Sequence, residues 1–284
     1  MYYQDCDLGE LSGIQEESYN RIISRIENSK RIVLKFGTDA VGAIFNGYGK
    51  SFSEDVAYEI ETGREFVIVS SGAIGLGKKV KQIHSESPII EKSIYASLGQ
   101  PLLIGMWRDL LGANNIVSSQ VLYENENLLG DSNHREYIKN GLESMINNRI
   151  VPIANENDAV TSEEIKADMR TKSFGDNDNL ARLICELINA DLMIFFTNSG
   201  GIYKDISDKK TLYKAIFDSN EQLVTQCGDK KSENGRGGLA SKLKYSIELS
   251  ELGIPVVIAS SETDNCLERA LYDHHNHTII IPKK

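Results

Sequence analysis

Short runs of apolar residues alternate with longer amphipathic segments along most of the chain. Such nearly continuous apolar runs are typical of strands that are buried on both faces of a parallel sheet. They predict strands at residues 31–36, 65–70, 116–121, 150–154, 192–197 and 255–259. The amphipathic segments predict helices at residues 15–28, 93–111, 132–147, 179–189 and 239–252. This alternation predicts an α/β fold with a mainly parallel central sheet.

Composition and charge narrow the class of protein. The 284 residues suffice for a large core, and the net charge of -10 argues against a nucleic-acid-binding surface. No apolar run is long enough to cross a membrane, and the polar first ten residues are unlike a signal peptide. The four cysteines show no C-x-x-C spacing. We therefore expect a cytoplasmic protein with reduced thiols that binds neither nucleic acid nor membranes.

Acid and amide side chains crowd into two short segments. Asn-Glu-Asn-Asp-Ala-Val begins at Asn155, after a predicted strand, and Phe-Gly-Asp-Asn-Asp begins at Phe174, before a predicted helix. Asx-turns and helix caps would account for Asp176 or Asn177, but not for the whole set. Such side chains can together hold an amine, a carboxylate and a magnesium-bound phosphate. The two segments therefore favour phosphoryl transfer to a small polar metabolite.

Three further loops contain glycine next to lysine or serine. They are Lys35-Phe36-Gly37-Thr38, the segment from Ser70 to Gly77, and the segment from Gly235 to Lys242. Glycine lets the backbone approach an anion, and the start of a helix offers free amides. Their spacing fits neither a dinucleotide-binding loop nor a Walker loop. A strand-end lysine, a helix cap and a surface loop are the alternatives. In a parallel sheet, however, ligands bind beyond the carboxyl ends of the strands, where these loops lie.

The histidines fall outside every motif. A histidine-rich segment near the C-terminus, residues 274–277, is interpreted as a solvated loop that leads into an edge strand. We therefore expect no metal-binding side chains.

In their order along the chain, these motifs resemble the glutamate 5-kinases of the amino-acid kinase family. The resemblance spans about residues 31–281 and also includes Leu-Gly-Gln at Leu98. It implies a three-layer α/β/α sandwich, with the amino acid in the N-terminal lobe and ATP in the C-terminal lobe. It implies one kinase domain at residues 29–284, after an extension and helix at 1–28, without the C-terminal RNA-binding-like domain of many relatives.

The implied activity is the ATP-dependent phosphorylation of the γ-carboxylate of L-glutamate to L-glutamyl 5-phosphate, the first step of proline biosynthesis. ATP and Mg²⁺ are the implied cofactors, with feedback inhibition by proline and assembly into a homo-oligomer, either a dimer or a tetramer. A carboxylate with a pKa of about 4.3 is ionised at neutral pH and needs no general base. A site with lysines and carboxylates but no histidine suits such a nucleophile.

The resemblance also implies individual roles. Lys35 and Lys242 would flank the transferred phosphoryl group, with Asp178 orienting them, and both lysines would lie at element ends where their loss leaves folding nearly unchanged. The implied substrate-binding residues are Ser71, Gly72, Asn157, Asp158 and Asn177. The implied nucleotide-binding residues are Gly37, Thr38, Thr197, Asn198, Gly235, Arg236, Gly237 and Gly238.

Several positions depart from the family pattern. Asn198 replaces an aspartate, Ser241 replaces a threonine, and Arg236 adds a charge to the glycine-rich loop. Residues 166–172 lengthen the segment between the two acidic motifs. They are predicted to form a flap at the mouth of the glutamate pocket, with an inert surface excursion as the alternative. Two other functions stay open. One is phosphorylation of another acidic amino acid or a glutamate analogue, and the other is a non-catalytic nucleotide- or amino-acid-binding regulator on the same fold.

Overall fold

A nine-stranded sheet forms the centre of the computed structural model, which describes residues 2–4, 13–124, 128, 132–160, 177–205, 207–216 and 239–282. In chain order its strands are β1 (Tyr2–Gln4), β2 (Arg31–Phe36), β3 (Glu65–Ser70), β4 (Val117–Tyr123), β5 (Ile150–Glu156), β6 (Leu192–Thr197), β7 (Tyr213–Ile216), β8 (Val256–Ser260) and β9 (Thr278–Ile280). Neighbouring strands are parallel except in the β1–β7 and β8–β9 pairs. The mainly parallel α/β sheet predicted from the apolar runs is confirmed.

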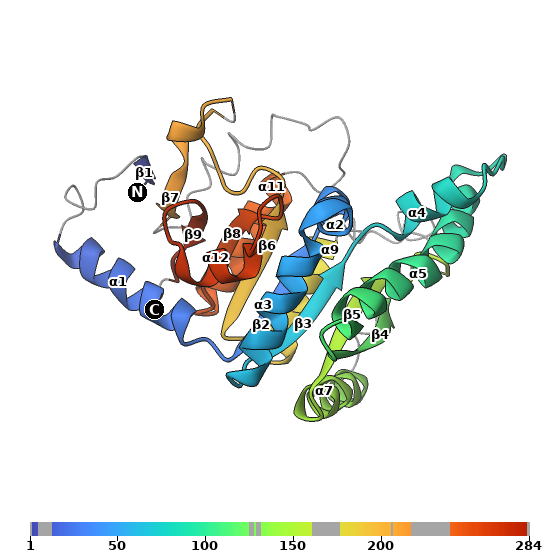
Figure 1. The fold of residues 1–284 in the computed structure, drawn as a ribbon, viewed down its shortest axis with the longest axis horizontal. Helices are drawn as coiled ribbons and strands as arrows, with labels where there is room; N and C mark the ends of the chain where they lie inside the picture. Colours follow the sequence, from blue (N-terminus) through green and yellow to red (C-terminus); the bar gives the residue numbers. More distant parts are fainter. Residues whose placement is uncertain are drawn as a thin grey trace.

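Helices cover both faces of the sheet (Figure 1). One apolar core lies under α1 (Gly13–Glu27), α2 (Thr38–Ala43), the π-helix η2 (Ile44–Tyr48), α3 (Gly49–Glu61), α5 (Pro88–Gly112) and α12 (Cys266–Tyr272). The other lies under α7 (Ser132–Asn147), α9 (Asn177–Leu187) and α11 (Leu239–Glu251). Further helices in the described part of the chain are α4 (Ala73–Val80), which packs on α5, and the short 3₁₀-helix η3 (Lys209–Thr211). The described elements therefore form three layers.

Alternation along β2 decides which side chains meet which layer. Leu34 and Phe36 enter the core under α2, α3 and α5, whereas Val33 enters the core under α9 and α11. Successive side chains of a strand point to opposite faces. Lys35 is therefore directed to the layer that contains α9 and α11.

The order of the strands places a ligand crevice near β2. The sheet runs β1-β7-β9-β8-β6-β2-β3-β5-β4, so β2 has β6 on one side and β3 on the other. The chain leaves β2 toward β3 and later returns to β6, which makes this a topological switch point. In doubly wound sheets, ligands bind outside the carboxyl ends of strands at such a point. The ends of β2, β3 and β6 are level there, since Phe36 pairs with both Ser70 and Phe196.

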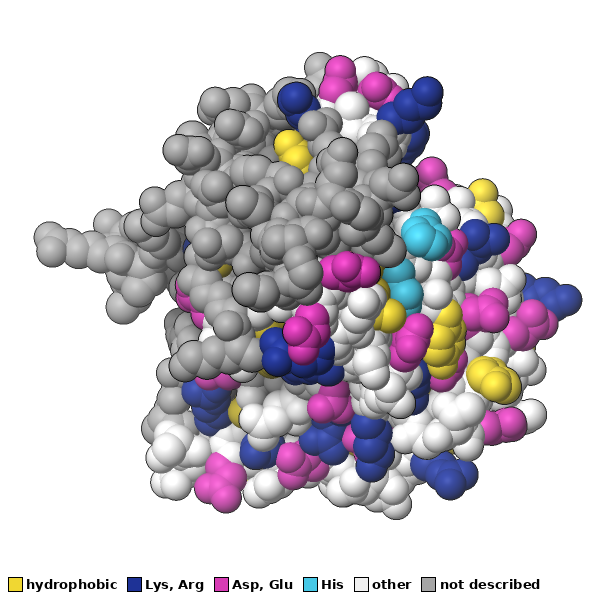
Figure 2. Space-filling view, turned by 90° about the vertical axis from the view of Figure 1, so that its left-hand side faces the viewer, with side chains coloured by type: hydrophobic (Ala, Val, Ile, Leu, Met, Phe, Trp, Pro, Cys, Tyr) yellow, Lys and Arg dark blue, Asp and Glu magenta, His cyan; other side chains and the backbone are white. Residues whose placement is uncertain are grey.

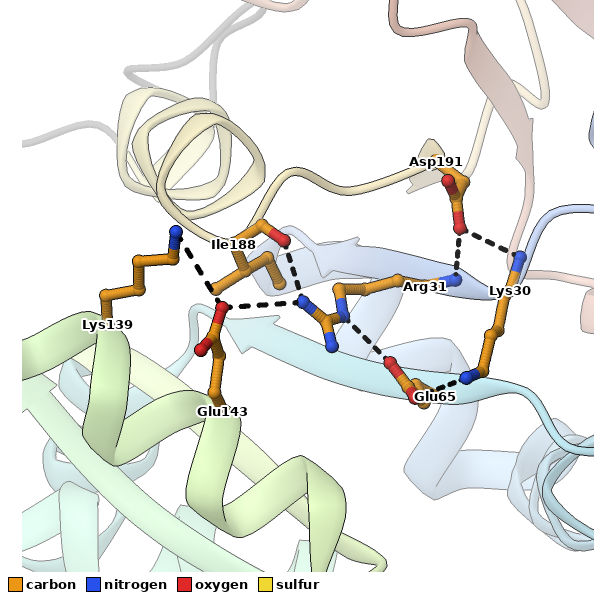
Figure 3. Close-up of polar contacts among 7 residues, drawn as sticks. All are labelled: Lys30, Arg31, Glu65, Lys139, Glu143, Ile188 and Asp191. Carbon is orange, nitrogen blue, oxygen red and sulfur yellow. Dashed lines mark hydrogen bonds and ion pairs between the residues drawn. The ribbon is translucent and has the colours of Figure 1, made fainter.

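Ion pairs and hydrogen bonds join the central strands at their opposite, amino ends (Figure 3). Arg31 Nε lies 2.8 Å from Glu65 Oε2, and its guanidinium also donates to the carbonyl of Ile188 at 2.9 Å. Asp191 Oδ2 accepts hydrogen bonds from the backbone amides of Lys30 and Arg31 at 3.0 and 2.7 Å. These contacts join the starts of β2, β3 and β6 and lie far from the crevice.

The segment after Tyr272 differs from the sequence interpretation. β9 lies between β7 and β8, so it is an interior strand and not an edge strand. His277, just before β9, is buried with 2% of its surface exposed. Burial, together with the nearby charge of His274, lowers the pKa of its imidazole to about 3. The interpretation of this stretch as a solvated loop was therefore wrong at His277.

The surface and the helices show two further features. Acidic and basic side chains are interspersed over the described part of the face shown in Figure 2, instead of gathering into a basic patch. In the part of the chain that the structure describes, no helix combines the length and the apolar character needed to cross a membrane. Cys185 and Cys266 are free thiols, and both are buried.

Candidate functional site

Three charged side chains from distant parts of the chain meet at the carboxyl end of β2. The ammonium group of Lys35 forms an ion pair with Oδ1 of Asp178, in the first turn of α9. Oδ2 of the same carboxylate lies 3.1 Å from Nζ of Lys242, one turn inside α11. It also accepts a hydrogen bond of 2.8 Å from the hydroxyl of Ser241. One carboxylate therefore fixes two lysines.

This charged group is buried. Asp178 has no exposed surface, and Lys35 is 4% exposed. Burial by itself would raise the pKa of the Asp178 carboxyl, but the charges of Lys35 and Lys242 outweigh it and hold that pKa below its ordinary value. Asp178 therefore stays ionised at neutral pH. Because Lys35 is buried, we expect its loss to lower the stability of the protein, in contrast to the sequence-based expectation of nearly unchanged folding.

A network of amide side chains lies beside the lysines. Nδ2 of Asn177 donates to the hydroxyl of Ser71 at 2.9 Å and to Oδ1 of Asn155 at 3.0 Å. Nδ2 of Asn155 in turn donates to Oε1 of Gln100, on α5, at 2.8 Å. Oδ1 of Asn177 is buried, and it makes no hydrogen bond with any residue that the structure describes. An acceptor left in this state costs free energy unless a ligand supplies a donor.

The turn after β5 holds the second carboxylate of the candidate site. The amide of Asn157 donates to the carbonyl of Tyr123 at 2.9 Å, which places Asp158 just beyond the ends of β4 and β5. Burial raises the pKa of Asp158, and the positive charge of Lys92 offsets part of that rise. Asp158 is partly buried and forms no ion pair or hydrogen bond to the described side chains. It is an acceptor suited to an ammonium group.

Gly72 begins the helix that follows β3. Its φ of 114° lies in the left-handed region, which favours glycine, and it is the N-cap of α4. The free amides at the start of α4 point out from the end of β3, beside Ser71. This turn therefore offers a hydroxyl and backbone donors to an anion.

A cavity of about 460 Å³ opens near the carboxyl ends of the strands, on the side of the sheet that α2 covers. Thr38 and Asn198 line it together with Asp39 and Glu262. Thr197 is placed differently, because its Oγ1 accepts a hydrogen bond from the amide of Gly200 at 3.0 Å. Two of the predicted nucleotide-binding residues, Thr38 and Asn198, therefore line one cavity, whereas Thr197 stabilises the turn beside it.

Some predicted residues cannot be placed. Gly235, Arg236, Gly237 and Gly238 lie outside the described residues, as does the predicted flap at 166–172. Gly37 is described, and a Cβ atom there would lie 3.7 Å from Nζ of Lys35. The sequence interpretation did not single out Gln100 or Asn155 as site residues. Their signal was present in the Leu-Gly-Gln and Asn-Glu-Asn-Asp motifs, but each needs the packing of α5 against β5 to acquire a partner.

The described residues contain no group of three or more His, Cys, Asp or Glu side chains arranged to hold a metal ion. The carboxylate of Asp178 already forms ion pairs with the ammonium groups of Lys35 and Lys242. Asp39 and Glu262 provide carboxylate oxygens, the donors that Mg²⁺ prefers, along the wall of the cavity.

Comparison with known proteins identifies relatives along nearly the whole chain. Residues 30–260 match the family described as the Amino acid kinase family. The chain is 32% identical over 265 residues to a protein of Alkaliphilus metalliredigens named glutamate 5-kinase, with 89% of this chain and 96% of that protein covered. A protein of the same name from Clostridium perfringens is 30% identical over 269 residues, covering 91% and 98%. A third, from Streptococcus pneumoniae, is 31% identical over 250 residues, covering 85% of this chain and 66% of that protein.

Proposed function

Since the chain belongs to the amino acid kinase family, we propose that this kinase transfers the γ-phosphoryl group of ATP to the γ-carboxylate of L-glutamate. The observation that carries the proposal is the pairing of Lys35 and Lys242 with the buried carboxylate of Asp178. Relatives named glutamate 5-kinase support the choice of glutamate. The product would be L-glutamyl 5-phosphate, and its use in proline biosynthesis is part of the proposal.

In the proposed reaction, a γ-carboxylate oxygen of glutamate attacks the γ-phosphorus of ATP. A new O–P bond forms while the bond between the γ-phosphorus and the β,γ-bridging oxygen breaks, and ADP leaves with the electron pair. No proton is transferred, because the nucleophile is already ionised. Catalysis then rests on holding two anions together and on stabilising the charge of the moving group. Lys35 and Lys242 would do this, and Asp178 would hold both in place.

The glutamate side would use the amide network. Asp158 would accept the α-ammonium group, and the orphan Oδ1 of Asn177 would accept a second hydrogen bond from the substrate. The hydroxyl of Ser71 and the backbone amides of Gly72 and Ala73 would bind a carboxylate group of the substrate. Asn157 would contribute to the glutamate side through the backbone of the turn that carries Asp158.

The nucleotide side would use the loop after β2 and the turn after β6. Gly37, Thr38 and Asn198 would contact ATP, together with the glycine-rich segment that contains Gly235 and Arg236. Asp39 and Glu262 would offer carboxylate oxygens to Mg²⁺, which when bound would neutralise part of the charge of the phosphates.

We also propose a homo-oligomer in the cytoplasm, subject to inhibition by proline. Exposed apolar side chains support association, since Ile90 and Leu102 of α5 are 53% and 45% exposed. Val117, on the edge strand β4, is 61% exposed. Light scattering after size-exclusion chromatography would give the number of subunits, and an activity titration with proline would test the inhibition.

The decisive experiment measures ADP release with glutamate, aspartate and N-acetylglutamate as separate acceptors. Hydroxylamine added to the reaction converts an acyl phosphate into a hydroxamate, so its formation distinguishes carboxylate phosphorylation from ATP hydrolysis. We expect glutamate to give both ADP and hydroxamate, and Asp178→Asn to give neither at a comparable rate. If aspartate or N-acetylglutamate reacted faster than glutamate, that acceptor would be the substrate in place of glutamate. Binding of glutamate and ATP without ADP release would instead indicate a regulator.

A further inference from the structure

Three polar side chains of α5 are spaced seven residues apart: Ser93, Gln100 and Trp107. Seven residues are close to two turns of an α-helix, so these side chains lie along one face of α5. Figure 1 shows α5 as a long helix beside β4 and β5, extending beyond the sheet together with α4. A polar row on a helix that packs against a sheet needs partners, because unpaired polar groups are costly there.

The first two members of this row bind the end of β5 and the turn that follows it. The hydroxyl of Ser93 donates to the carbonyl of Ala159 at 2.5 Å. Oε1 of Gln100 accepts from Nδ2 of Asn155 at 2.8 Å. Both ends of the stretch that contains Asp158 are therefore attached to one helix.

The third member binds Ser70, the last residue of β3. Nε1 of Trp107 donates to the hydroxyl of Ser70 at 2.8 Å, and that hydroxyl donates to the carbonyl of Ser71 at 3.1 Å. Trp107 is fully buried. The same helix face thus reaches the Ser71 loop and the Asn155–Asp158 turn, which belong to different strands.

Close packing of α4 on α5 adds a second link to the Ser71 loop. A Cβ atom on Gly99 would lie 1.7 Å from the carbonyl oxygen of Ala73, and one on Gly77 would lie 1.9 Å from that of Tyr95. The backbones of the two helices are therefore in direct contact. Because α4 begins directly after Gly72, a displacement of α5 would displace this loop as well.

We infer that α5 positions the two substrate-binding segments relative to each other, with Ser93 and Gln100 as positioning residues for the acidic substrate. Gln100 acts through Asn155, whose Oδ1 holds Asn177. Ser93 acts through Ala159, next to Asp158. This inference rests on the proposed function, because it takes Asp158 and Asn177 as substrate contacts.

The test compares Gln100→Met and Ser93→Ala with a matched control, Ser97→Ala. Ser97 is exposed on the same helix, and its hydroxyl donates only within the helix, to the carbonyl of Ile94. Loss of one positioning hydrogen bond should raise the KM for glutamate roughly three- to tenfold, with the KM for ATP unchanged. Gln100→Glu and Ser93→Thr keep an acceptor and a hydroxyl, respectively, and should restore most of the affinity.

Hydrogen exchange supplies a readout that does not depend on activity. In Gln100→Met and Ser93→Ala, the amides of residues 155–160 should exchange faster than in Ser97→Ala. Equal exchange, together with an unchanged KM for glutamate, would overturn the inference, as would an equal loss for both substrates that the conservative variants do not rescue. If the unmodified enzyme releases no ADP with glutamate, the proposed function fails, and the exchange comparison alone decides whether α5 positions these segments.

Discussion

The ammonium group of Lys242 lies 3.1 Å from Oδ2 of Asp178, a carboxylate without exposed surface. The two residues are 64 positions apart in the chain and come from α11 and α9. A lysine held in this way loses little conformational freedom when a phosphate binds beside it. The pairing therefore pre-organises a positive charge at the point where negative charge would develop.

Lys242→Ala is expected to lower turnover by about 10²-fold or more, the scale for loss of one preorganised charge. The control is Lys244→Ala on the same helix, because Lys244 is exposed and pairs only weakly at the surface with Glu248. Steady-state kinetics with saturating glutamate and ATP would measure the effect. Equal turnover of the two variants would remove Lys242 from the phosphoryl-transfer site.

Lys35→Ala is expected to reduce both turnover and stability. Lys35 is buried against Asp178, so its removal leaves that carboxylate with less compensation inside the protein. Breaking a buried ion pair on one side costs about 3 kcal/mol of unfolding free energy. Urea unfolding followed by circular dichroism would measure it. An unchanged midpoint would show that the remaining partners of Asp178, which include Lys242 and Ser241, compensate its charge without Lys35.

Lys92→Met is expected to shift the acid limb of the glutamate KM profile to higher pH. Burial raises the pKa of Asp158, and Lys92 offsets part of that rise, so without Lys92 the pKa rises further. Asp158 must be ionised to bind an ammonium group, and KM should therefore begin to increase at a higher pH than in the unmodified enzyme. Measurements of the KM for glutamate from about pH 5 to 8 would show it.

Two variants bracket this result. Lys79→Met removes an exposed lysine of α4 and should leave the profile unchanged. Asp158→Asn should raise the KM for glutamate roughly ten- to a hundredfold and abolish the Lys92 effect, because no carboxylate is left to titrate. A shift that persists in the Lys92→Met, Asp158→Asn double variant would assign it to another group.

The sequence predicted the fold where its signal is strong. The runs at 31–36, 65–70 and 192–197 coincide with β2, β3 and β6, because a strand buried on both faces must be apolar throughout. The helices over residues 38–61 were not predicted. Gly42, Gly47 and Gly49 interrupt the helical pattern there, and a π-helix separates α2 from α3. β1 and β7 have three and four residues, too few for a period to be detected. A strand after residue 277 was expected, but at the edge of the sheet, whereas β9 lies in its interior.

The site was predictable to the extent that strand ends define it. Lys35 lies near the end of a predicted strand, and Ser71 and Asp158 follow predicted strands, so the sheet rule alone places them at the carboxyl ends of the strands. The Lys35–Asp178 contact depends on the resemblance, because spacing gives no reason for residues so far apart to meet. The role inferred for Gln100 depends on tertiary packing. A glutamine in the middle of a helix has no local signal until α5 is placed against β5.

Glu65→Gln is expected to destabilise the protein at neutral pH but progressively less in acid. Burial alone would raise the pKa of Glu65, but Arg31 and Lys30 hold it below the ordinary value of 4.5 (Figure 3). A carboxyl whose folded pKa is depressed contributes stability above its unfolded pKa and loses it as the pH falls through the folded pKa. The difference in Tm should therefore be largest near neutral pH and shrink below 4.5. Glu61→Gln, at an exposed position of α3, should show no such trend.

Gly99→Ala should disrupt the contact between α4 and α5, whereas Gly105→Ala on the same helix should not. A Cβ on Gly99 would lie 1.7 Å from the backbone oxygen of Ala73, while nothing lies within 4 Å of a Cβ on Gly105. Overpacking against backbone costs about 1–3 kcal/mol. By contrast, replacing an unhindered helical glycine by alanine gains roughly 0.5–1 kcal/mol. The two variants should therefore move Tm in opposite directions.

If Gly99→Ala also raises the KM for glutamate and Gly105→Ala does not, the α4–α5 contact positions the Ser71 loop. A raised Tm in both variants would show that the helices separate easily, which is incompatible with α5 as a rigid support.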